Sequence, residues 1–126
     1  MAYPPSYRLV RRSDGRVIAS RVEVAQGPLQ RAAGLIGRRA LGEDAALVLP
    51  RCRAIHMCFM RFSIDAVFVD AGWRVVALHP TLGPWRMTPW VRAAASVVEL
   101  PCGGIARTGL ALGDHLSLDQ ISMCQV

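Results

Sequence analysis

The residues with the clearest chemical potential lie between positions 52 and 70, in the run CRAIHMCFMRFSIDAVFVD. This run places a histidine, an arginine and an aspartate, namely His56, Arg61 and Asp65, among side chains that are otherwise mainly apolar. Apolar runs of this kind belong in a protein core, where an unpaired ionised group is very costly. We therefore expect these three side chains to be paired with each other, with partners elsewhere in the chain, or with a ligand.

Two further charged residues, in other parts of the chain, also require partners. Glu99 is flanked by apolar residues in SVVELP, and Arg86 lies in the segment PWRMTPW. A network of buried ion pairs, with Arg61 as the nearest partner of Asp65, explains these residues without a substrate. Alternatively, Arg61 or Arg86 binds an anionic ligand in a bidentate manner, while the acids orient the guanidinium groups. The candidate walls of such a pocket are aromatic, namely Trp85 and Trp90.

A small enzyme is an alternative hypothesis. His56 would act as acid or base, and Asp65 would orient it. The chain has no G-x-S-x-G elbow, no H-E-x-x-H motif and no glycine-rich dinucleotide turn. It also has no lysine, which excludes a side-chain Schiff base and a P-loop lysine. The question of catalysis therefore stays open, and the candidate nucleophiles are Cys52, Cys58 and Ser63.

Zinc binding is a further hypothesis. If residues 52–60 are extended, Cys52, His56 and Cys58 share one face of the strand, and thiolate and imidazole are zinc ligands. However, C-x3-H-x-C is not a familiar zinc motif, and no second paired motif accompanies it. A core face with reduced thiols and a hydrogen-bonded histidine is the favoured interpretation, so we predict no metal and no cofactor. Candidates for completing a zinc site would be Cys102 and His79.

The overall composition limits the class of partner. The chain has 126 residues, a formal net charge of +6 and 52% hydrophobic residues, which is sufficient for one packed domain. All 15 basic residues are arginines, but they are scattered and do not interleave with aromatic residues, so a nucleic-acid partner is not expected. No apolar stretch reaches the roughly 20 residues that span a bilayer, and no apolar leader is evident. We therefore predict a cytoplasmic protein without a membrane span.

Most of the predicted secondary structure consists of short strands. The Asp14-Gly15 pair is a turn signal between two strands. Residues 28–36 begin with a proline, place apolar residues on one face and precede Gly37, which predicts a helix. A long loop is expected at 79–90, because it contains three prolines and a glycine. The predicted strands are 7–11, 16–24, 46–49, 54–60, 64–69, 73–78, 96–100 and 115–118, with one helical turn in 103–109.

This pattern favours a mainly β fold. Seven or eight short strands with one short helix in the N-terminal half are typical of a small antiparallel β-sandwich or barrel-like domain. We expect residues 1–126 to form a single domain with a core at about 7–118, a short flexible N-terminus and a C-terminal tail.

Several of these residues belong to motifs that occur together. An M-R-x-x-I-D core at Met60–Asp65 is followed by P-W-R at Pro84–Arg86 and by E-L-P-x-G at Glu99–Gly103. With these motifs the chain resembles, over about residues 7–118, the family named Domain of Unknown Function 192. The resemblance implies a small, mainly β domain with a short helix. It implies no particular reaction or ligand, because none is assigned to the family.

The leading hypothesis is a non-catalytic ligand-binding or accessory domain. Its partner would be a small polar or anionic ligand, or a protein that offers a peptide. Charge-assisted contacts from arginine and an apolar wall from tryptophan would form the site. The predicted ligand-binding residues are His56, Arg61, Asp65, Trp85, Arg86 and Glu99.

Overall fold

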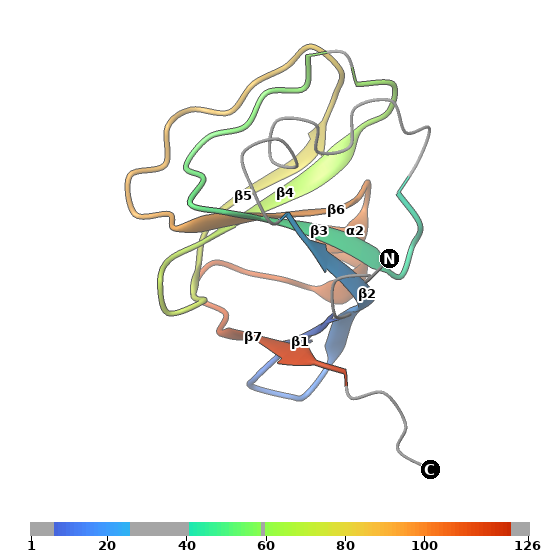
Figure 1. Ribbon diagram of the computed structural model, residues 1–126, viewed down its shortest axis with the longest axis vertical. Helices are drawn as coiled ribbons and strands as arrows, with labels where there is room; N and C mark the ends of the chain where they lie inside the picture. The colour runs from blue at the N-terminus through green and yellow to red at the C-terminus, as the bar shows by residue number, and fades with distance from the viewer. Residues whose placement is uncertain (1–6, 26–40, 59, 122–126) are drawn as a thin grey trace, which may run out of the picture.

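The computed structural model describes residues 7–25, 41–58 and 60–121, and all seven strands in this part of the chain belong to one sheet (Figure 1). The elements are β1 (Tyr7–Arg11), β2 (Val17–Val24), β3 (Ala45–Pro50), β4 (Ile64–Val69), β5 (Val75–Leu82), β6 (Ser96–Pro101), the short helix α2 (Gly104–Thr108) and β7 (Leu116–Gln120). The strand order across the sheet is β5-β4-β6-β3-β2-β1-β7. No helix in the described ranges is long and apolar enough to cross a membrane.

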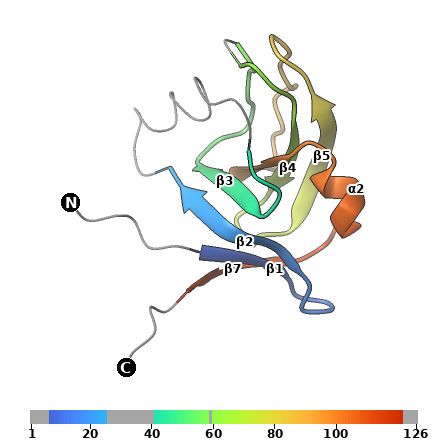
Figure 2. The ribbon, with the colours of Figure 1, turned by 90° about the vertical axis from the view of Figure 1, so that its right-hand side faces the viewer.

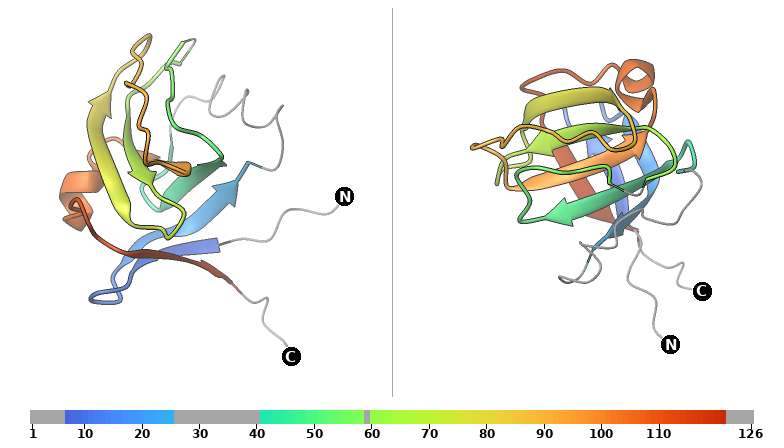
Figure 3. Two further views of the ribbon diagram at one scale, coloured as in Figure 1. Left: turned by 90° about the vertical axis from the view of Figure 1, so that its left-hand side faces the viewer. Right: turned by 90° about the horizontal axis from the view of Figure 1, so that it is seen from above.

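The sheet curls into a half-barrel (Figure 3). Its two end strands, β5 and β7, come close to each other where they begin. Arg74 and His115 form an isolated β-bridge there, and the N–H of Val75 donates to the carbonyl oxygen of Asp114 at 2.9 Å. The mainly β, barrel-like fold with seven or eight strands that the sequence predicts is therefore confirmed.

Strand β4, which lies between β5 and β6, is buried on both of its faces. All six of its residues are buried, and the five apolar ones are divided between two hydrophobic cores. Val67 and Val69 pack into the core inside the curl, whereas Ile64, Ala66 and Phe68 pack beneath the loops that follow β3 and β5. Burial on two faces explains why this strand is a continuous apolar run rather than an alternating one.

One pair of strands departs from the antiparallel pattern. β2 and β3 run parallel, with Arg21 opposite Ala45. The other five pairs in the sheet are antiparallel, so the sequence prediction holds except at this pair. Parallel neighbours require a long crossover connection. The helix predicted at 28–36 falls within this crossover, outside the described residues.

The turn between β1 and β2 forms where Asp14-Gly15 predicts it. Gly15 has a φ of 71°, a backbone conformation that favours glycine. The carboxylate of Asp14 accepts hydrogen bonds from the side chain of Arg11 at 2.9 Å and from the N–H of Arg16 at 3.0 Å. Arg11 is largely buried and also lies 3.5 Å from the carboxylate of Asp114. The hydrogen bond from Arg11, followed by that from Arg16, lowers the pKa of Asp14 to about 2.

β5 is longer than the sequence predicts. The strand continues to Leu82, whereas a loop is expected from His79 onwards. Pro80 is tolerated because it lies on an end strand between the paired residues His79 and Leu82, so its missing N–H removes no ladder hydrogen bond. Between the pairs Ile64–Leu82 and Ala66–His79, β5 has one residue more than β4. This β-bulge leaves part of the backbone of β5 without a ladder partner.

Candidate functional site

Two irregular segments, residues 51–63 and 83–95, run alongside each other at the upper left of Figure 1. Backbone hydrogen bonds hold them together, so their outward side chains are positioned without taking part in the pairing. We call the exposed side of these two segments, apart from residue 59, the loop face. The backbone bonds run from Met57 N to Arg86 O at 2.7 Å, from Thr88 N to Ile55 O at 2.9 Å and from Val91 N to Arg53 O at 2.8 Å.

The orientation of His56 differs from the expected one. Ile55 and Met57 are buried in the core beneath the loops, and His56 between them is exposed. The favoured interpretation of a core face that contains His56 is therefore wrong, because the alternate face of the same extended segment supplies the larger apolar side chains. The prediction that this histidine is hydrogen-bonded holds, since its Nδ1 accepts the N–H of Cys58 at 3.3 Å.

Asp65 is only 1% exposed, and backbone amides satisfy its carboxylate. Oδ1 accepts the N–H of Thr81, in the β5 bulge, at 2.8 Å, and Oδ2 accepts the N–H of Ile105 at 2.8 Å. Ile105 lies in the first turn of α2, which packs beside β4 and β6 (Figure 2). The predicted pairing of Asp65 with Arg61 is wrong: Arg61 is exposed, and no ion pair within the described ranges joins the two. A bulge and a helix start both leave free N–H groups, and here these groups are the donors to Asp65 in place of the guanidinium of Arg61.

Glu99 lies on the opposite face of the sheet from Asp65. It is buried on β6, directly opposite Leu47 of β3 and Ala66 of β4. Residues directly opposite each other share a face, whereas successive residues of a strand point to opposite faces. Glu99 therefore points beneath the loops, and Asp65 points into the curl. The two acids do not converge on a common centre. Asp65, which the enzyme hypothesis requires to orient His56, is instead hydrogen-bonded to backbone amides.

The loop face combines positive charge with exposed apolar side chains. Segments 51–63 and 83–95 contain no Asp or Glu. Three large apolar side chains are strongly exposed, namely Trp85 at 64%, Met87 at 71% and Trp90 at 69%. Such a surface favours an anionic partner that also offers flat or apolar groups. Its five arginines, all exposed, are Arg51, Arg53, Arg61, Arg86 and Arg92.

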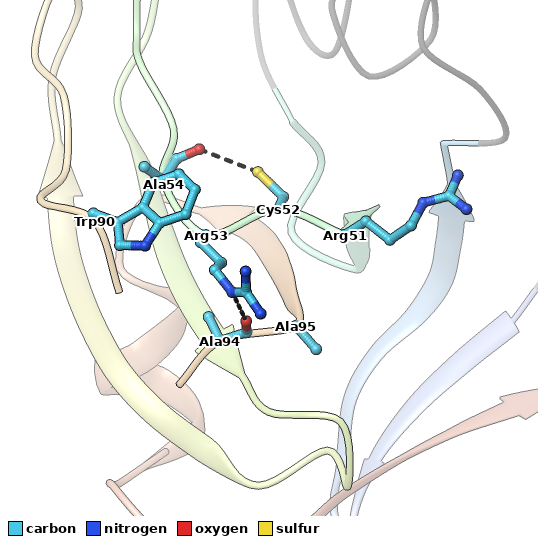
Figure 4. A pocket seen from close by; sticks show the side chains of 7 residues that line it. All are labelled: Arg51, Cys52, Arg53, Ala54, Trp90, Ala94 and Ala95. Carbon is cyan, nitrogen blue, oxygen red and sulfur yellow. Dashed lines mark hydrogen bonds between the residues drawn. The ribbon is translucent and has the colours of Figure 1, made fainter. Parts of the chain in front are cut away.

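A cavity of about 400 Å³ opens on the loop face (Figure 4). In Figure 4 the Trp90 indole and the Arg53 guanidinium lie close to the alanines of the wall, whereas Arg51 points away from the other lining residues. Arg53 Nε donates to the carbonyl oxygen of Ala94 at 2.9 Å, which fixes the plane of the guanidinium. The lining residues are Arg51, Cys52, Arg53, Ala54, Trp90, Ala94 and Ala95.

The described cysteines are not part of a metal-binding group. Within the described part of the chain, no three His, Cys, Asp or Glu side chains form a group that could hold a metal ion. The candidate zinc ligands Cys52 and Cys58 are partly buried free thiols, and Cys52 donates to the carbonyl oxygen of Ala54 at 3.1 Å. Cys102 is an exposed thiol near Thr81. Cys124 lies outside the described residues.

The sequence matches the family DUF192, described as "Uncharacterized ACR", over residues 9–118. The chain belongs to this family. The resemblance drawn from the sequence motifs is thereby confirmed. Relatives named UPF0127 proteins include one from Thermococcus sibiricus, 32% identical over 112 residues that cover 86% of this chain and 72% of the relative. Another, from Pyrococcus furiosus, is 33% identical over 111 residues that cover 85% of this chain and 94% of the relative.

Two crystal structures of other proteins have a similar fold. One, from Sinorhizobium meliloti, is described as a proposed transcription regulator; it is 27% identical, with a TM-score of 0.80, and the match covers 94% of this chain and 96% of that one. The other, from Novosphingobium aromaticivorans, is described as a protein of unknown function; it is 24% identical, with a TM-score of 0.75, and the match covers 89% and 83% of the two chains. The family and the fold follow from these comparisons, and the function has to be argued from the site.

The sequence motifs predict only part of the loop face. Trp85, Trp90 and Arg86 are predicted pocket residues, whereas Arg53 and the cavity that it lines are not predicted. A usable signal was present: the chain has nine acidic residues, and none of them falls in 51–63 or 83–95, the two segments that form this face.

Proposed function

We propose that this protein is a non-catalytic binding domain that holds an anionic partner on its loop face. The observation that carries the proposal is the gathering of five exposed arginines on two hydrogen-bonded segments that contain no acidic residue. A guanidinium group donates in a bidentate manner to phosphate or carboxylate groups. Because the backbone pairing already orders the two segments, binding loses less conformational entropy than it would on a free loop.

Four of the predicted ligand-binding residues take part in this proposal directly. His56, Arg61, Trp85 and Arg86 all have exposed side chains on the loop face. Asp65 and Glu99 are buried, so we assign them to the support of the fold beneath the face rather than to contact with the partner. The description of the Sinorhizobium meliloti relative as a proposed transcription regulator adds nucleic acid to the candidate anionic partners.

Titration with heparin, used as a generic polyanion, tests the proposal. We expect intrinsic tryptophan fluorescence to change on binding, and we expect the affinity to fall as salt rises. Replacing both Arg61 and Arg86 by alanine should weaken heparin binding by about tenfold or more. The matched control replaces Arg8 and Arg12, two exposed arginines outside the loop face, which removes the same charge. Equal weakening by both double variants, or no heparin binding at low salt, would contradict the proposal.

We also propose a cytoplasmic location. Cys52, Cys58 and Cys102 are free thiols, and the cytosol keeps thiols reduced. Cell fractionation with an antibody against the protein tests this, and recovery in the membrane or exported fraction would contradict it.

A further inference from the structure

We infer that the loop face binds single-stranded nucleic acid, with the cavity beside Trp90 receiving a base and the neighbouring arginines contacting phosphates. The inference rests on the proposed anion-binding function and names the class of partner. It starts from the three-dimensional arrangement of residues that the linear sequence separates.

In the sequence, the arginines are scattered and do not interleave with aromatic residues. In the folded chain, segments 51–63 and 83–95 pair, so the segments that carry five of the arginines also carry the exposed indoles of Trp85 and Trp90; of the five, Arg51 points away from the Trp90 cavity. Proteins that bind single strands combine a positive surface that follows the phosphates with aromatic side chains on which bases stack. The scattering of the arginines and their separation from aromatic residues are properties of the linear sequence. Neither argues against a nucleic-acid partner for the folded chain.

The cavity has the size and walls that a flat ring requires. Its volume of about 400 Å³ lies within the range of small-molecule sites. Ala54, Ala94 and Ala95 line it with short side chains, and the indole of Trp90 lines it as well (Figure 4). The Trp90 side chain is 69% exposed, so a large part of its surface is available for stacking.

Arg53 supplies an oriented phosphate donor at the same cavity. Its Nε is engaged by the carbonyl oxygen of Ala94, which holds the guanidinium plane in place. The two Nη groups make no hydrogen bond to the described residues, so both remain available to the oxygens of a phosphate. A base beside Trp90 and its phosphate at Arg53 would thus be recognised together.

The geometry favours a single strand over a duplex. Bases in a duplex are stacked and paired, so they cannot enter a cavity or stack on a tryptophan without being extruded. Duplex readers instead insert a helix or a two-stranded ribbon into the major groove. The one helix in the described ranges, α2, contacts Asp65 on the face of β4 that points away from the loops. It therefore does not project from the loop face.

Fluorescence anisotropy with labelled oligothymidylate of about 12 nucleotides and a duplex of the same length tests the inference. At about 50 mM salt we expect the single strand to bind more tightly than the duplex. Trp90→Ala should weaken single-strand binding by about tenfold and leave heparin binding within about twofold, because only the strand offers bases to stack. Trp90→Phe should retain most of the affinity. Met87→Ala is the matched control, since Met87 is equally exposed and does not line the cavity.

The salt dependence isolates the phosphate contact. Arg53→Ala should reduce the slope of log K against log salt by about 0.7, the value for one phosphate contact on a single strand. Arg12→Ala, with the same change in charge outside the loop face, should leave the slope unchanged. Circular dichroism and thermal melting establish that each variant is folded.

Three results would overturn the inference without refuting the proposed function. Duplex binding as tight as single-strand binding would remove the role of unstacked bases. Equal weakening of heparin and oligothymidylate binding by Trp90→Ala would remove the stacking contact while leaving the proposed anion-binding function in place. Binding of thymidine monophosphate as tightly as the oligomer would identify a free nucleotide as the ligand. Absence of heparin binding, by contrast, would refute the proposed function together with the inference.

Discussion

The carboxylate of Asp65 accepts the N–H of Ile105 at 2.8 Å and so joins strand β4 to the first turn of α2. This helix has Gly103 at its N-cap position and no side-chain hydrogen bond of its own there. The free N–H groups of a helix start are usually satisfied by a capping side chain close in sequence. Here a residue 40 positions earlier in the chain does this, and its second oxygen accepts the N–H of Thr81 in the β5 bulge.

Removal of this carboxylate should destabilise the fold. Asp65→Ala leaves two partly buried N–H groups without their acceptor, so we expect a loss of about 2 kcal/mol in the free energy of unfolding. Asp65→Asn should lose less, because one oxygen can still accept. Urea unfolding measures both losses. The control is Glu43→Ala, which removes an exposed carboxylate and should change little. An unchanged urea midpoint for Asp65→Ala would show that these hydrogen bonds are not important for stability.

The turn between β1 and β2 should give the protein a defined acid sensitivity. The hydrogen bonds from Arg11 and Arg16 lower the pKa of Asp14 to about 2, compared with a usual value of 3.8. Because the folded-state pKa is the lower one, the carboxylate contributes its full stabilisation above its usual pKa. That contribution is lost as the pH falls from about 4 to about 2.

Asp14→Asn removes this contribution at every pH. The difference in urea midpoint between the natural protein and Asp14→Asn should therefore be largest near neutral pH and should shrink as the pH falls through the folded-state pKa. Other carboxylates, such as Asp44, titrate in both proteins and cancel in the difference. A difference in urea midpoint that stays constant between neutral and acid pH would show that Arg11 does not stabilise the Asp14 carboxylate in solution.

Seven of the eight predicted strands correspond to observed strands, because their signals are local. The strand predicted at 54–60 is wrong, since its described residues form only an isolated bridge at His56. Alternation, β-branched residues and the Asp14-Gly15 turn place β1 and β2 within a residue of their observed bounds. The continuation of β5 past Pro80 was not predictable in the same way. It depends on β5 being an end strand, which is a property of the strand order and not of the segment itself.

The site was predictable only in part, for a related reason. The sequence shows that Asp65 requires a partner, but side-chain patterns contain no information about which backbone N–H groups a bulge and a helix start leave free. Similarly, the alternation around His56 defines two faces without deciding which of them packs inward. That choice depends on the apolar surface of β3, β4 and β6 beneath Ile55 and Met57, which is assembled only in the folded chain.

Arg86 should contribute to binding and very little to stability. Its backbone takes part in the pairing of the two loop-face segments, since its carbonyl oxygen accepts the N–H of Met57 at 2.7 Å. Its side chain is exposed, so Arg86→Ala leaves that backbone bond intact. We expect weaker heparin binding and a change in unfolding free energy within about 0.5 kcal/mol. A large drop in melting temperature would instead identify Arg86 as a structural arginine.

Thr88 should link the stability of the loop face to its binding activity. Its N–H donates to the carbonyl oxygen of Ile55 at 2.9 Å, and its Oγ1 accepts the N–H of Ile55 at 3.0 Å, so the two residues are bonded reciprocally. Thr88→Val keeps the shape of the side chain and removes the acceptor, which leaves a buried N–H unsatisfied. We expect a loss of about 1–2 kcal/mol in the free energy of unfolding. Thr88→Ser retains the hydroxyl and is the control.

Thr88→Val should increase local opening of the loop-face segments without increasing local opening of the sheet. Amide hydrogen exchange at Ile55 should accelerate in Thr88→Val, while exchange at Ala66, in the middle of β4, should follow only the change in global stability. Heparin affinity should fall as well, because arginines on a less ordered segment lose more conformational entropy on binding. If exchange at Ile55 accelerates and heparin affinity stays the same, the pairing of the two segments is not what prepares the loop face for an anion.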